Sequence, residues 1–108
     1  MSTFKKQGRP LSEHALRQFV NRALQRGFVK EAYHSEHERA FRNISDEDVM
    51  FGLERSDWVL AKPPNYDPHP KHKTWEYLIR TRDIEGDELH LKIAVYPKEG
   101  RIKVITKF

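Results

Sequence analysis

The sequence predicts an α+β fold in which two to three N-terminal helices pack on one face of a three- to four-stranded antiparallel sheet. Apolar residues recur at helical spacing early in the chain, whereas apolar and polar residues alternate in its last third. The turns between the alternating segments are so short that neighbouring strands must be antiparallel. The 108 residues suffice for one hydrophobic core, so we expect a single domain over residues 1–108.

The N-terminal third predicts a flexible arm followed by a helix. Residues 1–9 are polar and are expected to be the arm. A helix is expected over residues 10–28, because Ser12 is a suitable N-cap and Gly27 a suitable stop. Its apolar positions follow the three- and four-residue spacing of a helix face: Leu11, Ala15, Leu16, Phe19, Val20, Ala23 and Leu24.

Two further helices and a short strand are expected before the sheet. Residues 34–42 predict the second helix, and the third should end near Arg55. Ser45 and Asp48 have the spacing of a capping box at its start. Residues 58–60 predict a short strand.

A proline-rich loop is expected over residues 62–73. Its four prolines argue against regular strand pairing. A loop of this length within a small domain is either disordered or functional.

Three strands are expected over residues 75–84, 88–96 and 101–108, joined by turns at 84–87 and 97–100. Alternation divides their side chains between two faces. The apolar face, expected to pack on the helices, takes Trp75, Tyr77, Ile79, Leu89, Leu91, Ile93, Val95, Ile102, Val104, Thr106 and Phe108. The other face is rich in Arg, Lys and His.

The turns predict a register for this second face. If Arg82 faces Glu88, Arg80 faces His90; if Tyr96 faces Arg101, His90 also faces Lys107. Arg80, His90 and Lys107 would then form one row across three strands, with Lys92 and Lys103 close by.

Such a row has the groups needed to cleave RNA without a metal. A histidine titrates near neutrality and can transfer protons, and cations stabilise charge that develops on a phosphate. His90 is the candidate proton-transfer residue, and Arg80, Lys92 and Lys107 are candidate phosphate contacts. The plainer alternative is a solvated face of a one-sided sheet, on which Lys and Arg are ordinary.

Composition narrows the functional classes. A net charge of +4 fits a polyanionic partner such as RNA, and equally a merely soluble surface. The absence of cysteine excludes disulfides and thiolate chemistry. The sequence shows neither a membrane-spanning run nor a signal peptide, so no membrane association and a cytoplasmic location are expected.

Four histidines are candidate ligands of a metal ion. His34 and His37 would share a helix face, and His69 and His72 lie in the proline-rich loop. Nothing in the sequence fixes that loop against the helix, so surface or phosphate-contacting roles are favoured over zinc. No metal or cofactor is expected.

Residues 34–108 resemble a bacterial family of domains of unknown function, number four-two-five-eight. Its pattern is a helix of the form His-x-x-x-Arg-x-x-x-Arg-x-Ile-Ser with acidic residues and Val behind it, an aromatic strand, and two strands ending in Val-Ile-Thr. The matching positions are His34, Arg42, Ile44, Ser45, Glu47, Asp48, Val49, Trp75, Leu89–Val95 and Arg101–Thr106. The middle arginine of the pattern falls on Glu38, with Arg39 beside it.

The family is similar to the RelE, ParE and BrnT toxins and to the barnase-like and EndoU-like nuclease fold. This resemblance implies a toxin-type endoribonuclease with a metal-free site of His, Arg, Lys and sometimes Thr. It nominates His34, Arg42 and Thr106 as site residues beside His90 and Arg80. Further RNA contacts are expected from Arg39, Arg82, Lys92, Lys103 and Lys107.

Other functions fit the same features. The chain could be a non-catalytic module that binds RNA or protein, such as an immunity or accessory protein, or a topoisomerase-inhibiting toxin. The helix over residues 10–28 lies outside the resemblance, and it could dock a protein antitoxin or simply complete the core.

Overall fold

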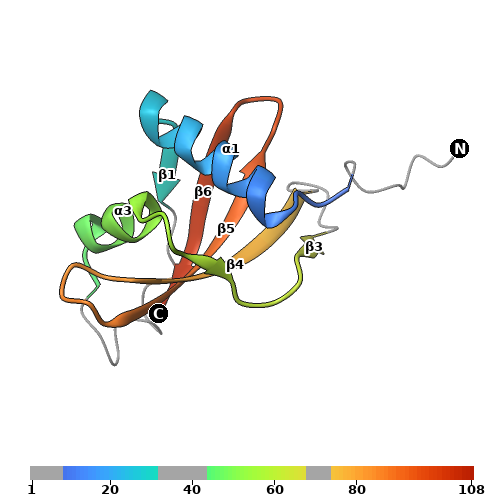
Figure 1. Cartoon of the computed structure of the whole chain (residues 1–108). Coiled ribbons are helices and arrows are strands. Elements are labelled where there is room, and N and C mark those ends of the chain that lie inside the picture. The colour runs from blue at the N-terminus through green and yellow to red at the C-terminus, as the bar shows by residue number, and fades with distance from the viewer. Residues whose placement is uncertain (1–8, 32–43, 68–73) are drawn as a thin grey trace, which may run out of the picture.

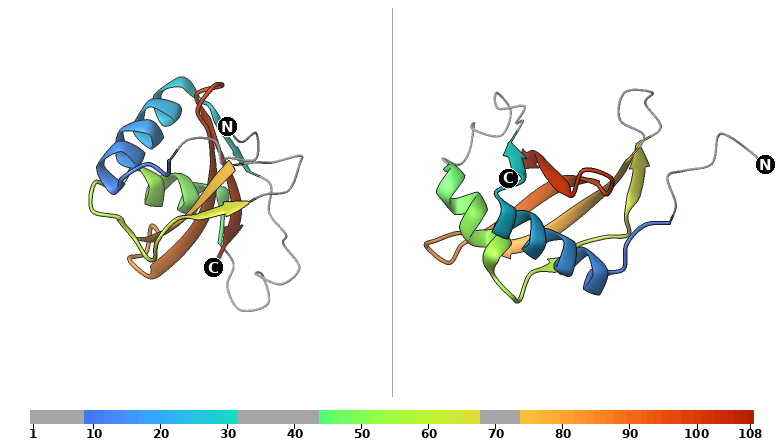
Figure 2. Two further views of the ribbon diagram at one scale, coloured as in Figure 1. Left: turned by 90° about the vertical axis from the view of Figure 1, so that its right-hand side faces the viewer. Right: turned by 90° about the horizontal axis from the view of Figure 1, so that it is seen from above.

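A computed structural model of the chain describes residues 9–31, 44–67 and 74–108. It confirms the α+β class, with two helices and a mostly antiparallel sheet in the described residues. Figure 1 shows the arrangement, and the two further views in Figure 2 place both helices on the same side of the sheet. The predicted helix over residues 34–42 and the predicted arm, Arg9 apart, lie outside the described residues.

Helix α1 spans Glu13–Arg26, inside the predicted range. The Ser12 hydroxyl accepts the Ala15 N–H at 3.1 Å, and Gly27 ends the helix in the left-handed region at a φ of 72°. Arg17 extends from this helix and donates to the Trp58 carbonyl at 2.6 Å. That contact joins α1 to the segment that enters the sheet.

Helix α3 spans Asp46–Glu54 and has the predicted capping box. The Ser45 hydroxyl accepts the Asp48 N–H, while the Asp48 carboxylate accepts the Ser45 N–H, each at 3.1 Å. Val49 and Leu53 are buried against the sheet.

The sheet has six strands in the described residues rather than the three to four predicted. Its order is β1-β6-β5-β4-β2, and β3 also pairs with β4. The strands span Val29–Glu31 (β1), Val59–Leu60 (β2), Asn65–Asp67 (β3), Thr74–Arg82 (β4), Glu88–Tyr96 (β5) and Arg101–Lys107 (β6).

Two strands, β1 and β3, were not predicted from the sequence. Strand β1 pairs in parallel with β6, and no short turn connects the two strands. Its three residues are too few to show the alternation that is typical of a strand. Strand β3 lies within the predicted proline-rich loop. Asn65–Asp67 contains no proline, so these residues can pair with β4 on the edge of the sheet.

The register between β5 and β6 contains a bulge. Tyr96 faces Arg101 as predicted, but the register shifts between Lys92 and Ile93, which pair with Thr106 and Val104. Ile105 is therefore the extra residue of β6, and every side chain beyond it changes face.

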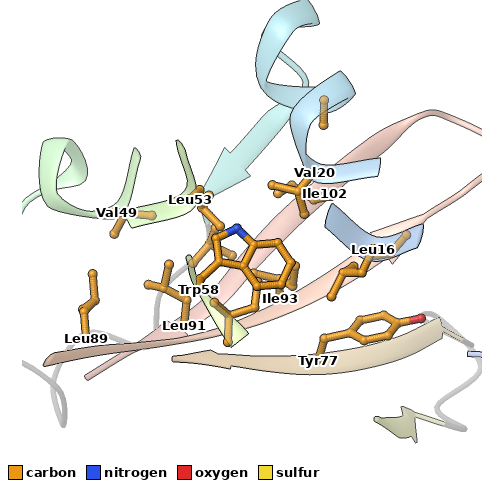
Figure 3. Packing of buried hydrophobic residues seen from close by; sticks show 14 of the residues in the cluster. Leu16, Val20, Val49, Leu53, Trp58, Tyr77, Leu89, Leu91, Ile93 and Ile102 are labelled. Atoms are coloured by element: carbon orange, nitrogen blue, oxygen red, sulfur yellow. The ribbon is translucent and has the colours of Figure 1, made fainter. Parts of the chain in front are cut away.

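The core lies between the sheet and the two helices. Figure 3 shows Trp58 among Leu16 and Val20 of α1 and Leu91 and Ile93 of β5, and all five side chains are fully buried. The predicted apolar face is thus correct up to the bulge.

Neither helix of the described chain is long and apolar enough to cross a membrane.

Candidate nucleic-acid interface

The side of the sheet away from the helices carries a group of cationic side chains, which we call the basic face. Antiparallel partners point to the same side of a sheet, and Arg80 faces His90 while Arg82 faces Glu88, as predicted. In the parallel pairing of β1 with β6, Lys30 lies opposite Lys103. The cations of the basic face are Lys30, Arg80, Arg82, His90, Lys92, Arg101 and Lys103.

A first row crosses this face through Arg80, His90 and Phe108. Two backbone hydrogen bonds join His90 and Phe108, at 2.7 Å and 2.9 Å. Their rings are stacked, with centroids 5.2 Å apart and planes inclined by 10°. Arg80 is exposed on the other side of His90. His90 thus lies between Arg80 and Phe108 in the order of the strands.

A second row passes through Lys92 and Thr106, which are register partners. The Lys92 ammonium lies 3.9 Å from the Glu76 carboxylate and its side chain is 43% exposed, so it remains accessible to a ligand. Thr106 was predicted on the apolar face. That placement is wrong, because the bulge turns its side chain to the same side as Lys92.

A carboxylate lies close to the His90 imidazole. The Glu88 Oε2 atom lies 3.4 Å from His90 Nε2. Glu88 also lines a surface hollow of about 430 Å³ together with Arg80 and Arg82. Arg82 donates to the Gly86 carbonyl at 2.9 Å, which fixes it over the turn between β4 and β5. The hollow therefore contains a carboxylate and two cations, and Glu88 connects it to His90.

Lys107 does not belong to this face. The predicted pairing of His90 with Lys107 is wrong, because Lys107 lies opposite Leu91 and its side chain is only 9% exposed. Its ammonium donates to the Ile44 carbonyl at 2.6 Å and lies 3.9 Å from an Asp46 carboxylate oxygen. Phe108 was predicted in the core, but it lies on the basic face in the position predicted for Lys107, and 46% of its surface is exposed.

The remaining predicted residues divide into two groups. Lys103 lies on the basic face, opposite Lys30. His34, Arg39 and Arg42 lie outside the described residues, as do His37, His69 and His72. No group of three possible metal ligands occurs in residues 9–31, 44–67 and 74–108.

Three residues of this surface were not predicted as site residues. Phe108 depends on the bulge, which parity counting ignores, and Lys30 depends on the unpredicted strand β1. Glu88 could have been found, since it precedes His90 by two residues on one strand and must share its face.

Comparison of the sequence with protein-family models and with curated proteins, and of the fold with solved structures, gave no match.

Proposed function

We propose that the chain is a toxin-type endoribonuclease that cleaves RNA on the basic face without needing a metal. One observation carries the proposal: Arg80, His90 and Phe108 form one row on the side of the sheet away from the helices. The row places a proton-transfer group next to a cation on a surface that a polynucleotide can reach.

The pair of Glu88 and His90 supplies both proton transfers. The Glu88 carboxylate accepts the proton of a ribose 2′-hydroxyl, whose oxygen then attacks the adjacent phosphorus. The bond from phosphorus to the 5′-oxygen breaks, and the protonated His90 donates its proton to that leaving oxygen. The products are a 2′,3′-cyclic phosphate and a 5′-hydroxyl.

The cations of the basic face stabilise the phosphorane. Arg80 makes no ion pair within the described part of the chain, so its guanidinium is available for two phosphate oxygens. Lys92 adds a point charge, and the Thr106 hydroxyl beside it can donate a hydrogen bond to the same phosphate. These groups act on charge that increases in the transition state.

The test is cleavage of end-labelled RNA by the purified protein in the presence of a chelator. The wild type should leave 2′,3′-cyclic phosphate ends, because the 2′-oxygen is the attacking group. His90→Ala should lower the rate about 10²- to 10⁴-fold. His14→Ala is the matched control, because His14 is an exposed histidine on α1, and its rate should equal that of the wild type.

Intact RNA with the folded wild type would exclude the nuclease. Equal rates for His90→Ala and the wild type would move the chemistry away from this row. Tight binding of RNA without cleavage would identify the alternative, a non-catalytic RNA-binding module.

A further inference from the structure

The stacked ring of Phe108 is the least explained feature of the basic face. One side of the ring lies against the His90 imidazole, yet 46% of the residue remains exposed. Isolated exposed hydrophobic residues are common. This one, however, lies nearly parallel to the side chain that we propose as a proton donor, and Arg80 lies beyond His90 in the same row.

Packing of the hydrophobic core does not explain why Phe108 lies on the outer side of the sheet. Without the bulge, alternation would turn Phe108 toward the helices and Lys107 toward solvent. The structure instead buries an ammonium group, which costs free energy unless the group is hydrogen-bonded. The Ile44 carbonyl and the Asp46 carboxylate provide that compensation. Lys107 thus anchors a register that keeps an aromatic ring on the outside.

The surroundings of the ring indicate the class of ligand. An exposed aromatic face binds another flat ring, and the cations of Arg80 and Lys92 favour a ligand with phosphates next to that ring. An unpaired nucleotide has both features, whereas the bases of a duplex are already stacked on each other. A phenyl ring has no hydrogen-bonding group, so it cannot distinguish one base from another.

We propose that Phe108 and His90 form a stacking site for one unpaired nucleobase of a single-stranded RNA. The inference rests on the proposed function and specifies its substrate: the base next to the reacting phosphate continues the stack beyond Phe108. Arg80 and Lys92 hold the phosphates on either side of that nucleotide. Because stacking tolerates all bases, the site selects single strands rather than a sequence.

The test is binding of short fluorescein-labelled 2′-O-methyl oligouridylate and oligoadenylate, followed by fluorescence anisotropy. These probes lack the attacking 2′-hydroxyl, so binding is measured apart from cleavage. Phe108→Leu keeps an apolar side chain but removes the aromatic face, and it should weaken both single strands roughly 5- to 100-fold. A blunt 2′-O-methyl duplex should bind wild type and variant alike. Phe108→Trp should restore single-strand affinity, and its indole fluorescence should be quenched on binding.

Phe51→Leu is the matched control, because Phe51 is an exposed phenylalanine on α3 and should not affect affinity. Unfolding curves of all variants confirm that they remain folded. If Phe108→Leu binds single strands as tightly as the wild type, the stacking site is wrong and the proposed nuclease can still stand. If Phe108→Leu loses affinity but the wild type cleaves no RNA, the stacking site stands and the nuclease does not. If the wild type binds no single strand, both proposals are wrong.

Discussion

The hydroxyl of Tyr77 joins the core to the start of α1. It accepts the Leu11 N–H at 2.9 Å, and the tyrosine is only 2% exposed. Burial disfavours the charged phenolate and raises the pKa of Tyr77, while the Leu11 N–H partly opposes that shift. The neutral phenol is therefore the form that stabilises the fold.

This pKa shift predicts a loss of stability in alkaline solution. As the pH rises above the unfolded-state value of about 10, the unfolded chain releases the phenolic proton while the folded chain retains it. The free energy of unfolding must then fall with rising pH. Tyr77→Phe should unfold with a smaller dependence on pH above that value in urea titrations. An unchanged dependence would show that Tyr77 ionises equally in both states.

Gly52 allows α3 to approach β4 closely. A Cβ atom at this position would lie 2.7 Å from Thr81 Cγ2 and 3.3 Å from the Arg82 carbonyl oxygen. The Thr81 hydroxyl already donates to the Gly52 carbonyl at 2.8 Å, which fixes the two elements against each other. A side chain at residue 52 therefore requires the helix to move.

Gly52→Ala should lower the free energy of unfolding by about 1–2 kcal/mol, because overpacking outweighs the better helix propensity of alanine. Urea denaturation measures the change. Adding Thr81→Ser removes the methyl group that clashes and keeps the hydroxyl, so the double variant should recover part of the loss. No recovery would place the strain at the Arg82 carbonyl or Leu89 instead.

The bulge in β6 marks the limit of what the sequence could predict for the sheet. The turn at residues 84–87 fixed the pairing of Arg80 with His90, and counting by twos was correct from there. The same counting failed after Val104, since one extra residue reverses every later side chain. Lys107 is stabilised on the helix side of the sheet by the Ile44 carbonyl and the Asp46 carboxylate, and both residues are far away in the sequence. Counting along one strand cannot predict such contacts.

Both helices cover one side of the sheet (Figure 2), and strand alternation places the basic face on the other side. The sequence predicted this division, because apolar side chains alternate with cations along β4 and β5. The net charge of +4 could not show that cations from four strands lie together, since β1 reaches that surface only through its pairing with β6.

The division predicts a salt dependence that is specific to one face. Affinity for single-stranded RNA should fall steeply between ~50 and ~200 mM salt, because bound phosphates release counterions. Arg80→Gln and Lys103→Gln should each reduce the slope of log affinity against log salt by about 0.7. Arg22→Gln removes the same charge from an exposed position of α1 and should leave the slope unchanged. Equal effects of all three variants would mean that only net charge matters.

The parallel pairing of β1 with β6 also has a consequence for biosynthesis. Within the described residues, the strand partners of residues 29–31 are residues 102–104, so this pairing cannot form on the ribosome until β6 has left the exit tunnel. Closing so long a loop is entropically costly, and contacts distant in sequence fold slowly. Until then Val29 remains without its final neighbours.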